Sequence, residues 1–102
     1  MPKFVAVAKA AQIAEGTVRC VETEGKRIAL LRKGGEFFAL ADECTHEGAP
    51  LSEGTVDGDE LRCPWHDACF NIRTGEATAP PADTGVARYN VRVAGDDVEV
   101  EV

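Results

Sequence analysis

The sequence predicts an all-β fold of antiparallel strands, and two features carry this prediction. Short runs rich in Val, Ile, Leu and Phe recur along the 102 residues, as expected of strands that bury one or both faces. Tetrapeptides that contain glycine separate several of these runs, where a tight hairpin turn needs a positive φ. The sequence shows no convincing helical period after residue 16. We therefore expect one small domain over residues 1–102, built as an antiparallel meander.

Taken in order, the strands are expected at residues 4–7, 17–22, 27–32, 36–41, 60–63, 86–93 and 98–102. The turn sequences TEGK (23–26), KGGE (33–36), VDGD (56–59) and AGDD (94–97) lie between strand-like runs. The segment AKAAQIA (8–14) has a composition that permits one or two helical turns. Irregular loops are expected at 44–51, 64–68 and 74–85, because His, Gly and Pro interrupt the strand rhythm there.

Composition and charge argue against nucleic-acid-binding and membrane-spanning proteins. The formal net charge is −7, and Lys and Arg are dispersed along the chain, which argues against a nucleic-acid partner. No apolar run approaches the roughly 20 residues that cross a bilayer, and the N-terminal stretch does not resemble a secretory signal. We expect a cytoplasmic, monomeric protein without a membrane partner. The acidity indicates either simple solubility or steering toward a basic partner.

Three of the four cysteines and both histidines lie within residues 41–70. They form two short pairs, Cys44-x-His46 and Cys63-x-x-His66, each compact enough for one loop to direct both side chains at a common point. Thiolate and imidazole together are ligands that soft or borderline metals select. The spacing leaves two alternatives open: tetrahedral zinc, or a [2Fe-2S] cluster with two Cys on one iron and two His on the other.

The context of the pairs favours iron over zinc. A Cys2His2 zinc finger places both cysteines first and both histidines later on a helix, whereas here the order alternates and strand-like CFNI follows the second pair. The segments CTHEGAPLSEG (44–54) and CPWHDACFNIRTGEA (63–77) resemble the two cluster-binding loops of Rieske-type ferredoxins. The similarity extends over essentially the whole chain, including a proline-bearing third loop near Pro80 and Pro81.

This resemblance implies a ligand set and a fold. Cys44 and Cys63 are expected to ligate one iron of a [2Fe-2S] cluster, and His46 and His66 the other. The implied fold is a small Rieske-type antiparallel β-sandwich with a cluster-binding subdomain at one tip.

The resemblance also implies a function: one-electron transfer from an NAD(P)H-oxidising flavoprotein reductase to a terminal oxygenase. Both partners are expected to dock transiently at the tip that carries His46 and His66. The protein is not expected to be an enzyme, because both histidines are committed to the cluster and none remains for the mononuclear iron site of an oxygenase. Two other readings stay open at this point: a zinc-stabilised binding module, and a Rieske-like small subunit of a reductase such as assimilatory nitrite reductase.

Departures from the pattern of high-potential Rieske proteins predict a low potential. Ala49 and Trp65 stand where those proteins carry a disulfide, so that bridge cannot form. Ala68 and Phe70 replace a Ser and a Tyr whose hydroxyls hydrogen-bond to the cluster. Without these donors the reduced cluster is less stabilised, and the potential should fall toward about −150 mV. Asp67, in place of a common Gly, adds a negative charge that further disfavours reduction.

Five other side chains receive structural roles. Cys20 is expected to be a small core residue, and Cys69 to pack on a strand face. Trp65 is expected to shield the cluster from water or to anchor a partner. Pro80 and Pro81 should stiffen a loop over the cluster.

Overall fold

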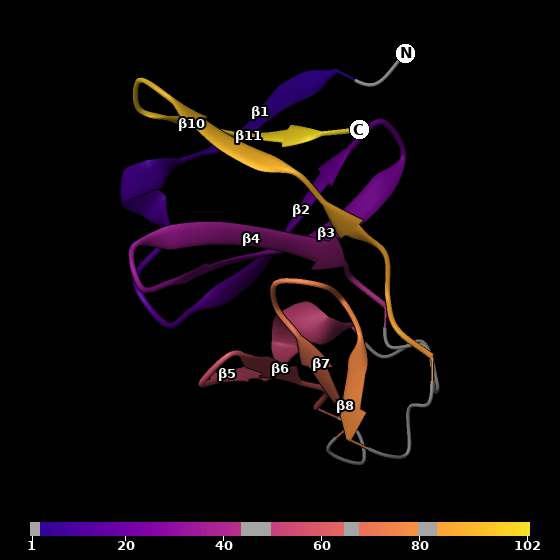
Figure 1. Ribbon diagram of the computed structural model, residues 1–102. Coiled ribbons are helices and arrows are strands. Elements are labelled where there is room, and N and C mark those ends of the chain that lie inside the picture. Colours follow the sequence, from indigo (N-terminus) through magenta and orange to yellow (C-terminus); the bar gives the residue numbers. More distant parts are fainter. Residues whose placement is uncertain (1–2, 44–49, 65–67, 80–83) are drawn as a thin grey trace.

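The computed structural model describes residues 3–43, 50–64, 68–79 and 84–102 (Figure 1). These residues form strands and two single 3₁₀ turns: β1 (Phe4–Lys9), η1 (Ala10–Gln12), β2 (Val18–Thr23), β3 (Lys26–Lys33), β4 (Glu36–Ala41), η2 (Leu51–Glu53), β5 (Thr55–Asp57), β6 (Glu60–Arg62), β7 (Cys69–Asn71), β8 (Ala77–Ala79), β9 (Arg88–Tyr89), β10 (Val91–Ala94) and β11 (Asp97–Glu101). Over these ranges no helix has the length and apolar character needed to cross a membrane.

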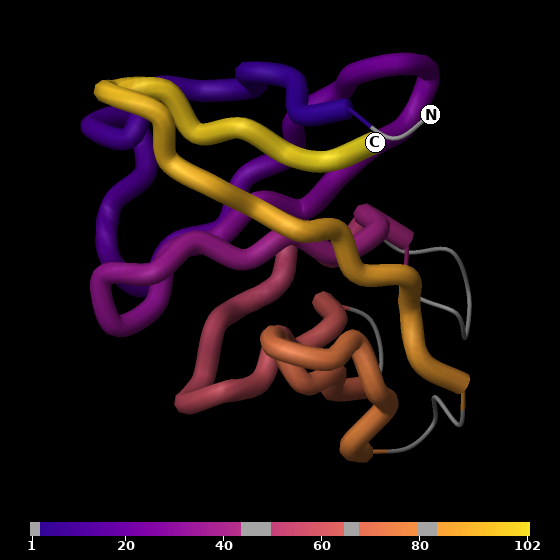
Figure 2. Tube along the Cα trace, turned by 45° about the horizontal axis from the view of Figure 1, so that its top comes forward, coloured from indigo at the N-terminus to yellow at the C-terminus, as the bar shows by residue number. Residues whose placement is uncertain are grey.

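The strands form three antiparallel sheets. Their orders are β1-β11-β10, β2-β3-β4-β9 and β5-β6-β7-β8. Figures 1 and 2 agree that the β2-β3-β4-β9 sheet is the middle layer, with the other two sheets on its opposite sides. We call β5-β6-β7-β8 the small sheet. The prediction of an all-β, antiparallel fold is confirmed.

The middle sheet is buried on both faces, and β3 shows this most clearly. All four of its residues 28–31 are fully buried. Ile28 and Leu30 pack into the core shared with β11, while Ala29 and Leu31 pack into the core beneath the small sheet. Successive side chains of a strand point to opposite faces, so a strand covered on both sides is apolar without alternation.

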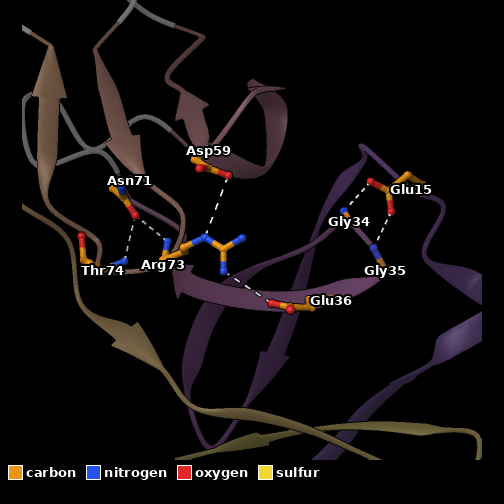
Figure 3. Close-up of polar contacts among 8 residues, drawn as sticks. All are labelled: Glu15, Gly34, Gly35, Glu36, Asp59, Asn71, Arg73 and Thr74. Atoms are coloured by element: carbon orange, nitrogen blue, oxygen red, sulfur yellow. Dashed lines mark hydrogen bonds and ion pairs between the residues drawn. The ribbon is translucent and has the colours of Figure 1, made fainter.

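The four predicted hairpin turns are confirmed, and each contains glycine at positive φ: Gly25, Gly34, Gly35, Gly58 and Gly95. The β3–β4 turn has an additional tie. The carboxylate of Glu15 accepts hydrogen bonds from the backbone N–H groups of Gly34 (2.6 Å) and Gly35 (3.0 Å) (Figure 3). These two bonds favour the charged form and lower the pKa of Glu15.

The 8–14 segment forms one helical turn, as its composition permits: β1 extends to Lys9, and η1 follows it. The structure differs from the sequence-based expectation in two places. The 86–93 run divides into β9 and β10, because β9 pairs with β4 in the middle sheet while β10 pairs with β11. Strands β5 and β8 were not expected; β8 lies inside the stretch 74–85 that was predicted to be irregular.

Candidate metal centre

Cys63 is the predicted ligand that falls within the described residues. Cys44, His46 and His66 lie outside them, and so do Ala49, Trp65, Asp67, Pro80 and Pro81. The structure therefore shows how the segments on either side of the predicted ligand loops are held.

Cys63 begins a short hairpin loop between β6 and β7. Its backbone N–H donates to the carbonyl of Ala68 at 2.6 Å, and this bond closes the base of the loop directly beyond the Arg62–Cys69 pair of the ladder. Cys63 is 1% exposed and shares its core with Leu51, Leu61 and Phe70. The loop that should carry His66 therefore starts and ends at fixed points inside an apolar core.

The first predicted ligand loop is fixed at both ends by one side chain. Asp42 follows β4 and is only 4% exposed. Its carboxylate accepts the Ser52 backbone N–H at 2.6 Å and the Ser52 hydroxyl at 2.7 Å. The backbone N–H of Asp42 donates to the carbonyl of Arg27 at 3.0 Å, which ties this point to β3.

Gly54 brings the end of the first loop onto the second. It follows η2, and a Cβ at this position would collide with the carbonyl oxygen of Arg62. Only glycine allows this backbone approach. Because Arg62 immediately precedes Cys63, the two predicted ligand loops are in direct backbone contact at their flanks.

The segment that follows the proline-bearing stretch packs against the β7–β8 turn. The backbone N–H of Val86 donates to the carbonyl of Gly75 at 2.8 Å, and a Cβ on Gly85 would also collide with that carbonyl. Val86 belongs to the same buried core as Cys63. A shallow hollow lies beside it, lined by Ala41, Glu43 and residues 85–87. The segment after the third loop thus contacts the end of the small sheet that holds the β7–β8 turn, whereas the flanks of the two predicted ligand loops meet at the opposite end.

Arg73 links the small sheet to the middle sheet (Figure 3). Its guanidinium lies 3.5 Å from the Glu36 carboxylate on β4, 3.9 Å from the Asp59 carboxylate in the β5–β6 turn, and 5.0 Å from the centre of the Phe38 ring. The Asn71 side-chain oxygen accepts the backbone N–H groups of Arg73 (2.8 Å) and Thr74 (3.1 Å). The contacts are exposed, so their individual contribution is small.

The two cysteines outside the predicted ligand set differ in environment. Cys69 lies in β7 and is 5% exposed, as a strand-packing residue should be. Cys20 lies on β2 but is only partly buried, so its assignment to the core was wrong. Burial and a hydrogen bond with Asp42 raise the pKa of the Cys20 thiol, against the opposing effect of Arg27. Cys20 is therefore a protonated neighbour of the Asp42 carboxylate.

The residues around Cys63 fit an iron–sulfur cluster. A thiolate is costly in an apolar core unless a cation is bound to it, and iron supplies that charge. Ala68 and Phe70 are fully buried beside Cys63, and neither side chain carries a hydrogen-bond donor. This apolar environment suits a thiolate that is bound to a metal.

Comparison with known proteins gives the family. Residues 3–90 match the model of the Rieske [2Fe-2S] domain. The chain belongs to the Rieske [2Fe-2S] domain family. The cofactor of this family is a [2Fe-2S] cluster, which agrees with the iron alternative drawn from the Cys–His pairs.

Two curated relatives show the contexts in which this Rieske domain occurs. The chain is 37% identical over 95 residues to human apoptosis-inducing factor 3, covering 93% of this chain but only 16% of that protein. It therefore spans about a sixth of that relative's length. It is 36% identical over 91 residues to the ferredoxin component of the naphthalene 1,2-dioxygenase system of Pseudomonas aeruginosa, covering 89% of this chain and 88% of the relative.

Solved structures confirm the Rieske-type fold. The ferredoxin of carbazole 1,9a-dioxygenase from Nocardioides aromaticivorans IC177 superposes with a TM-score of 0.92 at 31% identity, covering 96% of both chains. A chain from the complex of reduced oxygenase and oxidized ferredoxin in carbazole 1,9a-dioxygenase gives a TM-score of 0.89 at 38% identity, covering 95% of this Rieske domain and 91% of that chain.

Proposed function

We propose that this protein is a Rieske-type ferredoxin that carries single electrons from an NAD(P)H-oxidising flavoprotein reductase to a terminal oxygenase. The observation that carries the proposal is the buried Cys63 at the head of a closed hairpin loop, in a chain that aligns nearly end to end with a dioxygenase ferredoxin component. The protein would act as a monomeric, cytoplasmic carrier made of one domain, residues 1–102, and would perform no chemistry on a substrate itself.

The proposed ligands are Cys44 and Cys63 on one iron and His46 and His66 on the other. When bound, such a cluster accepts and releases one electron at a time. The chain contributes a thiolate at Cys63 and a dry environment around it, since Leu51, Ala68 and Phe70 are fully buried.

The partners are inferred from relatives and from charge. One matching solved structure is a complex of an oxygenase with a ferredoxin, which supports an oxygenase as the electron acceptor. Residues 43–87, which contain the small sheet, hold nine of the 18 acidic side chains and two of the 11 basic ones. The whole net charge of −7 therefore lies in this part, while the remaining residues are balanced. Such a distribution steers this end of the molecule toward a basic surface.

Stoichiometric electron transfer tests the proposal. The protein is reduced with dithionite under argon and freed of excess reductant. It is then titrated with increasing amounts of ferricytochrome c, a basic one-electron acceptor, until no more cytochrome is reduced. We expect one cytochrome reduced per chain, because the cluster gives up one electron. No reduction would point to a zinc-bound module, and two electrons per chain would contradict a single [2Fe-2S] carrier.

A further inference from the structure

We propose that Asp42 is a positioning residue for the cluster: through Ser52 it holds together the two ends of the first ligand loop and keeps them against the second. This inference rests on the proposed function, because it assumes that the two loops hold the cluster. Neither residue belongs to the Cys–His pattern that predicts the ligands.

The contact is strong because it is buried. Asp42 is the only polar or charged residue classed as buried among those that the structure describes. A buried carboxylate is unfavourable unless donors surround it. Ser52 provides two donors at 2.6 and 2.7 Å, from its backbone and its hydroxyl. Separation of Ser52 from Asp42 would leave the carboxylate with the Cys20 thiol and the more distant guanidinium of Arg27, at 3.9 Å.

The position of the contact in the chain gives it its role. Asp42 stands two residues before Cys44, and Ser52 stands six residues after His46. The nine residues between them, which include both proposed ligands of the first loop, are thus closed at the base by side-chain hydrogen bonds. Closing a loop in this way removes conformations in which its ends separate.

The contact also extends to the second loop. Leu51, next to Ser52, is fully buried in the same core as Cys63. Two residues further on, Gly54 approaches the carbonyl of Arg62, directly before Cys63. Asp42 itself is anchored on β3 through the carbonyl of Arg27. The Asp42–Ser52 contact therefore links the flanks of both ligand pairs to the middle sheet.

Three variants separate positioning from charge. Asp42→Asn removes the charge but keeps both contacts, since its side-chain oxygen can accept the Ser52 N–H and its amide can donate to the Ser52 hydroxyl. Ser52→Ala removes one contact and keeps the carboxylate. Asp42→Ala removes both the contact and the charge. Asp96→Asn, in the exposed β10–β11 turn, is the control for the loss of one negative charge.

The readouts are iron release to a chelator from the holoprotein, the g-values of the reduced protein by electron paramagnetic resonance, and hydrogen exchange of the Ser52 amide. We expect Ser52→Ala and Asp42→Ala to release iron about 10-fold faster or more, as loss of a hydrogen bond to a charged group implies, with shifted g-values. Asp42→Asn should stay within about 2-fold of wild type, because it retains both hydrogen bonds. Ser52 amide exchange should accelerate in Asp42→Ala whether or not metal is bound.

The other outcomes overturn the proposal in distinguishable ways. Wild-type release rates and g-values in Ser52→Ala and Asp42→Ala would refute positioning, even if both variants are less stable. Equal shifts in Asp42→Asn and Asp42→Ala, with Ser52→Ala unchanged, would assign the effect to charge alone. Wild-type protein without iron or sulfide would instead refute the proposed function, and positioning with it.

Discussion

A hydroxyl introduced at residue 68 should raise the reduction potential of the cluster. Ala68 is fully buried, and its carbonyl accepts the Cys63 N–H at 2.6 Å, so the substitution Ala68→Ser places a donor inside the second ligand loop. A hydrogen bond to a charged group contributes about 1.5–3 kcal/mol. For a one-electron couple this energy corresponds to about 60–130 mV if it acts entirely on the reduced state, and that is the upper range we expect.

The assay is a redox titration of wild type and Ala68→Ser, followed by the visible spectrum. Ala39→Ser is the matched control, because Ala39 is equally buried, at 2% exposure, but in the core on the opposite side of the middle sheet. We expect the control to keep the wild-type midpoint. An unchanged midpoint in a fully loaded Ala68→Ser protein would refute the reasoning, and a wild-type midpoint well above zero would contradict a low-potential carrier.

Three further predictions concern the backbone approach, an acid-sensitive contact and the surface charge. Gly54→Ala should reduce both iron content and the free energy of unfolding, the latter by about 1–3 kcal/mol, because its Cβ meets the Arg62 carbonyl. Gly58→Ala is the control, because a Cβ there has open space but the backbone has a positive φ; it should lose stability without losing iron. Equal iron loss in the two variants would argue against a role for the close contact between Gly54 and Arg62. Glu15→Gln should destabilise the protein at pH 7. The folded pKa of Glu15 is lowered, so its contribution is present above the unfolded value of 4.5 and disappears as pH falls through the folded pKa. Urea unfolding at pH 7 and pH 3 checks this, and a pH-independent difference would contradict it. Electron transfer to cytochrome c should slow as ionic strength rises from about 0.05 to 0.5 M, since salt screens the charge of the acidic end. A constant rate would mean that the acidic residues serve solubility and do not steer the partner.

The strands could be predicted where their signal is local. The hairpin turns contain glycine at positive φ, and the runs that form β3 and β4 hold consecutive apolar residues. Strands β5 and β8 are three residues long and depend on pairing with β6 and β7, which no single segment reveals. The break at Asn90 between β9 and β10 likewise follows from pairing with two different sheets.

The residues of the candidate site also differ in how well the sequence predicts them. The proposed ligands stand in short pairs, and thiolate with imidazole is chemically distinctive, so the sequence alone is enough to propose them. The contacts of Asp42 with Ser52, Gly54 with Arg62, and Arg73 with Glu36 join residues that are eight or more positions apart. Asp and Ser beside a strand end are common, and nothing in their spacing shows that they meet. The partial exposure of Cys20 and its place beside Asp42 were likewise not evident from the sequence of β2.

Metal and acid-labile sulfide analysis of the anaerobically purified protein tests the proposed cluster most directly, with the visible spectrum recorded before and after dithionite. We predict two irons and two sulfides per chain and a brown colour that partly bleaches on reduction. One zinc and no sulfide would contradict the cluster, and would mean that the same Cys and His residues hold a structural ion.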